Sequence, residues 1–183
     1  MPANTFYIYT DASFSKVRLF AVSAFLVFRN DEEHEAGVPP LSLIRTFSFN
    51  EKTNIRAELR GMLLALESIV VEVKQIHQER PKEKLEIKLF TDCQTAIQLL
   101  LRREKLEATG FVSQRKKEIL PNADLYRQFF ILYDQIRPEM IWVKGHSPKR
   151  GHGWMQKNFG ALDKIVRKEL RAKVLMDSGH LDK

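Results

Sequence analysis

The stretch that decides the fold lies near the middle of the chain and reads Glu86-Ile87-Lys88-Leu89-Phe90-Thr91-Asp92-Cys93-Gln94-Thr95-Ala96-Ile97. Its first part alternates between apolar and polar residues, which is typical of a strand, and a helical pattern begins directly after Asp92. The start of the chain repeats this arrangement, because a predicted strand over residues 6–10 runs into Asp11. Two strands that each deliver an aspartate at their end predict a shared acidic site.

The remaining elements follow from periodicity and turn residues. The predicted strands cover residues 6–10, 19–28, 43–49, 84–90 and 139–143. The predicted helices begin near residues 54, 94, 122 and 156, the first with Thr53 or Asn54 as its N-cap. The polar, proline-ended residues 30–40 predict a loop. Three strands joined by short connections predict an antiparallel meander, and strand–helix alternation afterwards predicts parallel strands. We therefore expect an α/β fold with a five-stranded mixed sheet flanked by helices.

The composition indicates a basic, folded protein. With 183 residues we expect one domain over residues 1–176, followed by a polar tail over residues 177–183. The net charge of +7 favours an anionic partner, nucleic acid first, although a basic solvated surface is the alternative. The single cysteine excludes an internal disulfide, and no apolar stretch is long enough to span a bilayer. We expect a cytoplasmic monomer without a membrane partner.

Four carboxylates are candidates for the acidic site. If the strands before Asp11 and Asp92 are neighbours, the two like charges raise each other's pKa unless a cation compensates them. Hard divalent ions with oxygen ligands, Mg²⁺ or Mn²⁺, do this. Glu58 in the first long helix and Asp163 in the last are further candidates. Each also has an ordinary explanation, as a turn residue, a helix-dipole charge or a solvated residue, and the pattern alone leaves these open.

The surroundings of these carboxylates resemble the type 1 ribonuclease H family, in that family's order. The matching segments are Tyr9-Thr10-Asp11-Ala12-Ser13, Thr53-Asn54-Ile55-Arg56-Ala57-Glu58-Leu59, Phe90-Thr91-Asp92-Cys93-Gln94, Trp142-Val143-Lys144-Gly145-His146 and residues 158–167. The similarity spans about residues 6–173. It implies a ribonuclease H-like fold over most of the chain.

The resemblance also implies an activity and the residues for it. Asp11, Glu58, Asp92 and Asp163 would be the catalytic and metal-binding residues of a site for two Mg²⁺ ions, with Mn²⁺ possible. Such a site hydrolyses the RNA strand of an RNA–DNA hybrid by a two-metal-ion mechanism. His146, in a loop rich in glycine and lysine, would be a further catalytic residue that assists proton transfer or product departure.

Substrate contacts are implied in the same way. Asn54 and Gln94 fall on family positions that contact the minor groove of the hybrid, where the 2′-hydroxyl distinguishes RNA. Residues 102–120 carry six cations against three glutamates and match in place the family's basic protrusion. Arg115, Lys116 and Lys117 would bind phosphates there. Phe111 stands where the family has tryptophan, so it is interpreted either as a binding residue or as a core contact.

The chain departs from the family pattern after the first strand, where Phe14-Ser15-Lys16-Val17-Arg18 replaces a glycine-rich loop. Ile55 and Cys93 also replace an asparagine and a serine. Two alternatives therefore accompany the hybrid nuclease. One is a module of this fold that binds nucleic acid without cleavage, and the other is a nuclease acting on structured DNA or double-stranded RNA. The presence of all four carboxylates favours an enzyme.

Overall fold

A mixed sheet of five strands forms the centre of the molecule in this computed structural model, which describes residues 4–36, 41–144 and 153–178. The strands are β1 (Asn4–Ser15), β2 (Phe20–Phe28), β3 (Arg45–Asn50), β4 (Leu85–Thr91) and β5 (Glu139–Trp142). Their order across the sheet is β3-β2-β1-β4-β5. The first three are antiparallel neighbours, whereas β4 runs parallel to β1 and β5 parallel to β4. The predicted fold class is confirmed.

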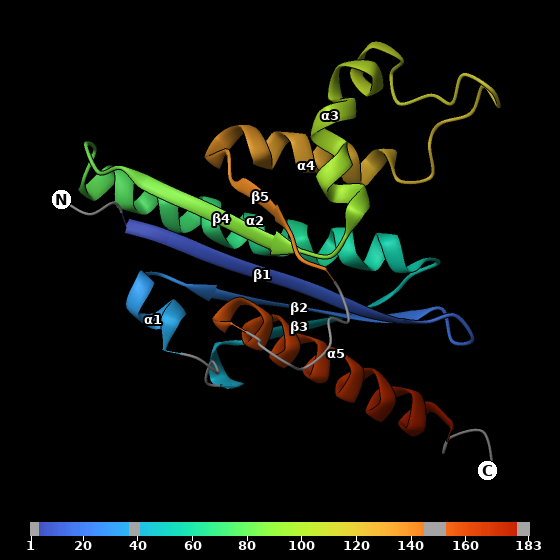
Figure 1. Ribbon diagram of the computed structural model, residues 1–183. Coiled ribbons are helices and arrows are strands. Elements are labelled where there is room, and N and C mark those ends of the chain that lie inside the picture. Colours follow the sequence, from blue (N-terminus) through green and yellow to red (C-terminus); the bar gives the residue numbers. More distant parts are fainter. Residues whose placement is uncertain (1–3, 37–40, 145–152, 179–183) are drawn as a thin grey trace.

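Helices cover both faces of this sheet (Figure 1). They are α1 (Asp31–Glu35), α2 (Asn54–Glu79), α3 (Gln94–Ala108), α4 (Ala123–Ile136) and α5 (Trp154–Ser178), with one 3-10 turn over Leu41–Leu43. The two long helices α2 and α5 lie on opposite faces, as Figure 1 shows. In the part of the chain that the structure describes, no helix combines the length and apolarity needed to cross a bilayer.

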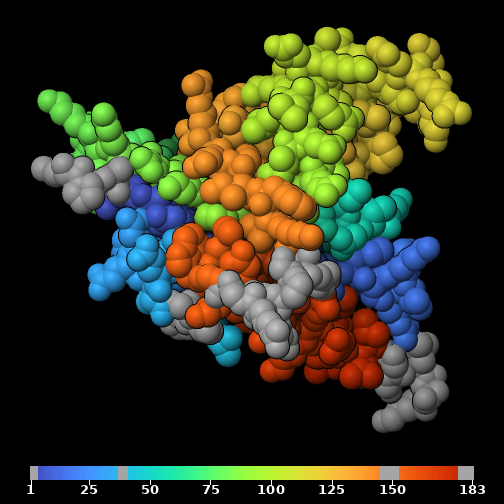
Figure 2. Space-filling model, viewed as in Figure 1, coloured from blue at the N-terminus to red at the C-terminus, as the bar shows by residue number. Residues whose placement is uncertain are grey.

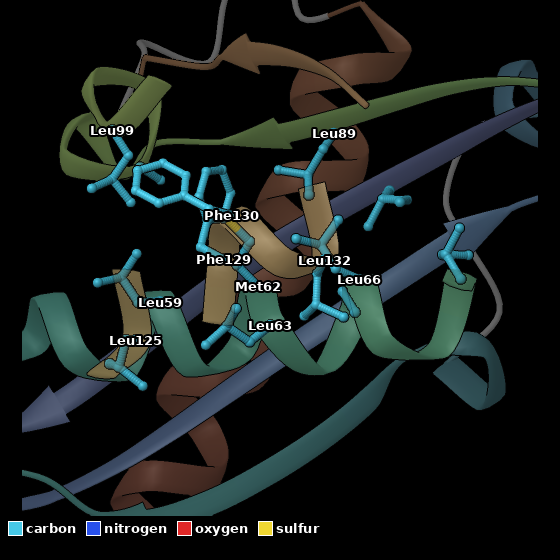
Figure 3. Packing of buried hydrophobic residues seen from close by; sticks show 14 of the residues in the cluster. Leu59, Met62, Leu63, Leu66, Leu89, Leu99, Leu125, Phe129, Phe130 and Leu132 are labelled. Carbon is cyan, nitrogen blue, oxygen red and sulfur yellow. The ribbon is translucent and has the colours of Figure 1, made fainter. Parts of the chain in front are cut away.

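The alternation of side chains along β1 divides the core into two layers. Ile8 points into the larger layer, which packs against α2, α3 and α4, whereas Tyr9 points into the smaller layer beneath α5. Figure 3 shows Met62 of α2 and Phe129 of α4 in the larger layer. Each face of β1 is therefore covered, with α2 and α5 on opposite sides of the strand that carries Asp11.

The start of α2 is held close to the sheet. Thr53 caps the helix by accepting a hydrogen bond from the Arg56 amide, as its sequence position predicts. A Cβ atom at Gly61 would lie 2.7 Å from the Cβ atom of Ser23 on β2, so only glycine allows this close approach. The Ser23 hydroxyl donates to the carbonyl oxygen of Ala57 at 2.7 Å. The turn that carries Glu58 is thereby fixed above the centre of the sheet.

Two predictions were wrong, and one predicted strand starts two residues too early. β1 does not end at Thr10 but continues to Ser15, because β2 remains paired with it as far as Ser15 and Phe20. The predicted loop over residues 30–40 contains α1, whose cap residue Asn30 accepts a hydrogen bond from the Glu33 amide. The predicted strand over residues 43–49 begins only at Arg45, since the preceding residues form the 3-10 turn. The other elements agree with prediction to within a few residues.

Candidate metal and nucleic-acid site

Asp11 lies within β1 and Asp92 directly follows β4, and the two aspartates are neighbours across the sheet, as predicted. β1 pairs in parallel with β4 in the register that places Tyr9 opposite Phe90, and Asp11 and Asp92 come two residues later on each chain segment. Glu58 approaches from α2 on one face of the sheet and Asp163 from α5 on the other. All four carboxylates line one hollow of about 430 Å³.

Asp11 is the most deeply buried of the four, with only 7% of its surface exposed. The Ala12 amide donates to Asp11 Oδ1 at 2.8 Å, but Oδ2 is buried without a hydrogen-bond partner among the described residues. Burial, and then the charge of Asp92, raise the pKa of Asp11 to about 8, with smaller contributions from Asp163 and Glu58. A buried, unpartnered carboxylate oxygen beside other carboxylates fits a hard divalent cation.

Glu58 is half-buried and is held by two donors. The Asn54 side-chain amide donates to Glu58 Oε1, and the thiol of Cys93 forms a second hydrogen bond to the carboxylate. Burial raises the pKa of Glu58, the two hydrogen bonds oppose this rise, and the charge of Asp92 adds to it. Burial, together with the charge of Glu58, also raises the pKa of the Cys93 thiol. Cys93 is therefore a neutral donor that orients Glu58.

Asp163 forms an ion pair within its own helix. Arg167 lies one turn later on α5, and its Nε atom is 2.7 Å from Asp163 Oδ1. As placed, no three His, Cys, Asp or Glu side chains among the described residues converge closely enough to hold a metal ion. Glu58 and Asp163 are instead bonded to Asn54 and Arg167. The four carboxylates are the type of oxygen donor that a divalent cation prefers. For all four to bind an ion, Glu58 must give up its hydrogen bond to Asn54 and Asp163 its ion pair with Arg167.

The predicted nucleic-acid contacts occupy two separate regions. Asn54 lines the acidic hollow, whereas Gln94 is exposed at the first turn of α3. Arg115, Lys116 and Lys117 are exposed beyond the end of α3, in a turn closed by hydrogen bonds between residues 113 and 118. In Figure 1 this segment lies on the other side of the sheet from α5. The predicted catalytic histidine, His146, falls outside the described residues.

Phe111 was interpreted either as a nucleic-acid-binding residue or as a core contact, and the structure shows that it is a core residue. It is only 7% exposed, and its ring centroid lies 6.2 Å from that of Phe130 on α4. The Arg127 guanidinium covers the ring at 4.6 Å from its centroid. The structure therefore excludes the stacking of a base on this side chain as it is placed.

Sequence reasoning missed several residues that line the acidic hollow. They include Phe14 from the end of β1 and Arg167 and Arg171 from α5. The spacing of four residues between Asp163 and Arg167 is a recognisable signal for an ion pair on a helix. The position of Phe14 carried no such signal, because it depends on the extension of β1 beyond Asp11.

Comparisons with known proteins place these features in a family. The family described as RNase H matches the chain over residues 3–171. None of the curated proteins matches the sequence. Among solved structures, LC9-RNase H1, described as a type 1 RNase H with the type 2 active-site motif, is 16% identical with a TM-score of 0.61. That alignment covers 92% of this chain and 72% of the other.

A second similar structure is the foamy viral protease-reverse transcriptase, described as a complex with an RNA/DNA hybrid. It is 17% identical, with a TM-score of 0.56, and the alignment covers 91% of this chain and 20% of that larger chain. At such identities the two likenesses show a shared fold.

Proposed function

The chain belongs to the RNase H family, and from this premise we propose that it is a metal-dependent endonuclease that hydrolyses the RNA strand of RNA–DNA hybrids. The observation that carries the proposal is the hollow in which Asp11 lies among three further carboxylates, with Oδ2 buried and unpartnered among the described residues. Without a compensating cation, so many negative charges around one buried oxygen are unfavourable.

In this proposal Asp11, Glu58, Asp92 and Asp163 hold two Mg²⁺ ions, with Mn²⁺ as a substitute. Members of this family generally use divalent metal ions. Bound at these oxygens, such ions supply polarisation of a phosphoryl oxygen and activation of water. The protein's own contribution begins with Asp11, whose raised pKa means that it carries a proton at pH 7 in the absence of a cation. Binding of the cation would therefore release that proton.

The surrounding side chains orient the acidic groups and the substrate. Asn54 and Cys93 hold the Glu58 carboxylate by hydrogen bonds, which limits its rotation. Asn54 also lies at the rim of the hollow, where it can meet the minor groove of a hybrid together with Gln94. His146 would move a proton to or from the reacting phosphate. Each of these roles is part of the proposal.

The flanking duplex would be bound mainly through its phosphates. Arg115, Lys116 and Lys117 project from a closed turn, so their charges are presented together to the solvent. We assign to them the phosphates of the DNA strand, because a cluster of cations binds a backbone without reading its sequence. The complex of the structurally similar reverse transcriptase with an RNA/DNA hybrid supports this choice of substrate.

Two observations support the alternative functions. First, the ion pair with Arg167 already neutralises the charge of Asp163 without a metal ion. Such an arrangement is compatible with a module that binds nucleic acid without cleaving it. Second, the β1–β2 hairpin replaces the glycine-rich loop of the family and brings Phe14 into the hollow, which alters the surface that would select the duplex. A nuclease for structured DNA or double-stranded RNA would share the same carboxylates.

One experiment separates these functions. Labelled RNA–DNA hybrid, double-stranded RNA, structured DNA and single strands are incubated with Mg²⁺, Mn²⁺ or EDTA, in parallel with the Asp92→Asn variant. We expect metal-dependent cleavage of the RNA strand of the hybrid, reduced at least a hundredfold in the variant. Circular dichroism should show that the variant is folded. Binding of the hybrid without cleavage in either metal would contradict the proposal, and cleavage of another duplex instead would reassign the substrate.

A further inference from the structure

A basic surface covers the solvent side of α5 next to the acidic hollow. We define the α5 basic surface as Lys164, Arg167, Lys168 and Arg171. With 100° of rotation per residue, these four side chains fall within a sector about 100° wide. They line a second hollow of about 470 Å³, in which Asp163 is the single carboxylate among the described lining residues. Four cations and one anion give this surface a local charge of +3.

The second hollow is continuous with the first. Asp163, Arg167 and Arg171 line both of them. Asp163, from α5, is the carboxylate of the acidic hollow that also lies beside the four cations. A polyanion with one group at the acidic site would reach the α5 basic surface with its neighbouring groups, since three residues of α5 line both hollows.

We propose that the α5 basic surface binds the phosphodiester backbone of the nucleic acid next to the phosphate that occupies the acidic site. This inference rests on the proposed function and adds a contact that is separate from the segment with Arg115, Lys116 and Lys117. α5 lies on the opposite side of the sheet from that segment (Figure 1). The nucleic acid would then be held on both sides of the site.

The dimensions of α5 suit this role. From Asp163 to Leu175 the helix rises about 18 Å, at about 1.5 Å per residue. Phosphates of one strand recur about every 3.4 Å along a duplex, so this length spans roughly five of them. The four cations recur every one or three residues from Lys164 to Arg171, a rise of about 10 Å that spans roughly three of these phosphates. The surface therefore suits an extended polyanion better than a single small anion.

The helix that presents these cations is fixed to the sheet. Leu162 and Val166 on its inner side are fully buried beneath β1 and β2, and the Lys173 ammonium lies 5.8 Å from the centroid of the Phe20 ring. Figure 2 shows α5 in red next to the blue hairpin of β1 and β2. Near the end of α5, Leu175 and Met176 are each 71% exposed, but Leu162, Val166 and Leu170 on its inner side are buried in the protein and are not available for insertion into a lipid surface. The geometry favours nucleic acid over a membrane.

The test compares two triple variants of the full chain that lose the same charge. One is Lys164→Ala/Lys168→Ala/Arg171→Ala on the α5 basic surface. The control is Lys74→Ala/Lys82→Ala/Lys84→Ala, at the end of α2 and the start of β4, far from the acidic hollow. Binding of a labelled RNA–DNA hybrid is measured in EDTA, where it is not cut, between about 50 and 200 mM salt.

Each lost phosphate contact removes a slope of about 0.9 from the plot of log affinity against log salt. We expect the α5 variant to flatten this slope by roughly two to three and to weaken binding at least tenfold at 50 mM salt, with the control unchanged. A further variant, Lys164→Arg/Lys168→Arg, keeps the charge and should retain the wild-type slope. Thermal unfolding of all variants shows whether a loss of fold contributes.

Three outcomes would overturn the inference. The first is a salt slope that stays unchanged in the α5 variant, and the second is an equal flattening of the slope in the control variant. The third is an α5 variant that loses binding to phosphatidylserine vesicles but still binds the hybrid as the wild type does. The cleavage assay above tests the proposed function independently. If the wild type binds the hybrid through α5 but never cuts it, the proposed activity is contradicted and this inference is supported. If the wild type cuts the hybrid but the α5 variant binds it with an unchanged slope, the proposed activity is supported and this inference is contradicted.

Discussion

Arg167 pairs with Asp163 across one turn of α5, with 2.7 Å between Nε of the arginine and Oδ1 of the aspartate. The pair is half-exposed, with 41% and 32% of the two side chains accessible. One carboxylate of the candidate metal site is therefore already neutralised by a side chain of its own helix. Any divalent cation that uses Asp163 must compete with Arg167 for this oxygen.

The Arg167→Gln variant should consequently bind Mn²⁺ more tightly than the wild type. An exposed ion pair of this kind contributes about 0–1 kcal/mol, so we expect an increase of up to about fivefold in affinity. Isothermal titration of the protein with Mn²⁺, without nucleic acid, measures it. The control is Arg102→Gln, which removes an exposed charge from α3. An affinity that stays the same or falls would show that Arg167 does not compete with the metal.

The raised pKa of Asp11 gives the metal-free protein a distinctive dependence on pH. Because this pKa lies near 8 in the folded state and near 3.8 in the unfolded chain, the folded state binds the extra proton between these values. The contribution of Asp11 to stability is thus fully present below about pH 4 and is lost as the pH rises through 8. Burial of the charged form in the folded state is the cause.

We therefore expect the Asp11→Asn variant to gain stability over the wild type as the pH is raised from 5 to 8 in EDTA, by several degrees in melting temperature. Addition of Mg²⁺ at pH 8 should stabilise the wild type and leave the variant unchanged. The affinity of the wild type for Mg²⁺ should rise by up to about tenfold per pH unit below pH 8, since one proton is displaced. Parallel melting curves for the two proteins at all pH values would contradict this account.

The hydrogen bond from Cys93 to Glu58 makes opposite predictions for two substitutions. Cys93→Ser keeps a donor at this position and should retain cleavage within about threefold. Cys93→Ala removes the donor and leaves the half-buried Glu58 less restrained, so we expect a loss of about tenfold in cleavage. Rates at saturating and limiting Mg²⁺ measure the two effects. Equal activity of the two variants would show that the thiol does not orient Glu58.

The same thiol should be unreactive in the folded protein. Cys93 is 2% exposed, and its raised pKa keeps it protonated. Reaction with a disulfide reagent such as Ellman's should be at least a hundredfold slower than in the unfolded chain, because only the thiolate attacks. Rapid labelling without unfolding would be inconsistent with the burial of this side chain.

The sequence was sufficient for those parts of the site that depend on local patterns. Asp11 and Asp92 were predicted to lie side by side on the condition that their strands are neighbours, which the pairing of β1 with β4 confirms, and the start of α2 followed from its Thr53 cap. The extension of β1 to Ser15 could not be predicted, since it arises from pairing with β2 rather than from the polar residues themselves. The contacts of Arg171 with the hollow likewise depend on how α5 crosses the sheet.

The short helix α1 shows a similar limit. The sequence predicted a loop here, and the burial of α1 depends on a partner far along the chain. His34 of α1 is 1% exposed, and its ring lies 3.9 Å from that of Trp154, the first residue of α5. The Tyr9 hydroxyl is 2.6 Å from His34 Nε2, and the Asn158 side chain donates to the His34 carbonyl oxygen at 3.4 Å.

These contacts make His34 an anchor for the first turns of α5, the helix that carries Asp163. We expect His34→Ala to lower the free energy of unfolding by about 2–4 kcal/mol, because it leaves a cavity and removes one of the two hydrogen-bond partners of the Tyr9 hydroxyl, the other being Asn158. Affinity for Mn²⁺ should fall as well, since α5 is less firmly held. Chemical denaturation and Mn²⁺ titration measure the two effects, with His77→Ala, an exposed histidine on α2, as the control.

The pH dependence of this variant provides a sharper test of the same contact. Burial lowers the pKa of His34 to about 4 in the folded state, against 6.5 for the ordinary imidazole. The unfolded chain therefore binds the extra proton between these values, so the contribution of His34 is present above pH 6.5 and is lost as the pH falls through 4. The stability gap between the wild type and His34→Ala should narrow as the pH is lowered from 7 to 4. A gap that stays constant over this range would mean that His34 does not remain neutral and buried against Tyr9 and Trp154.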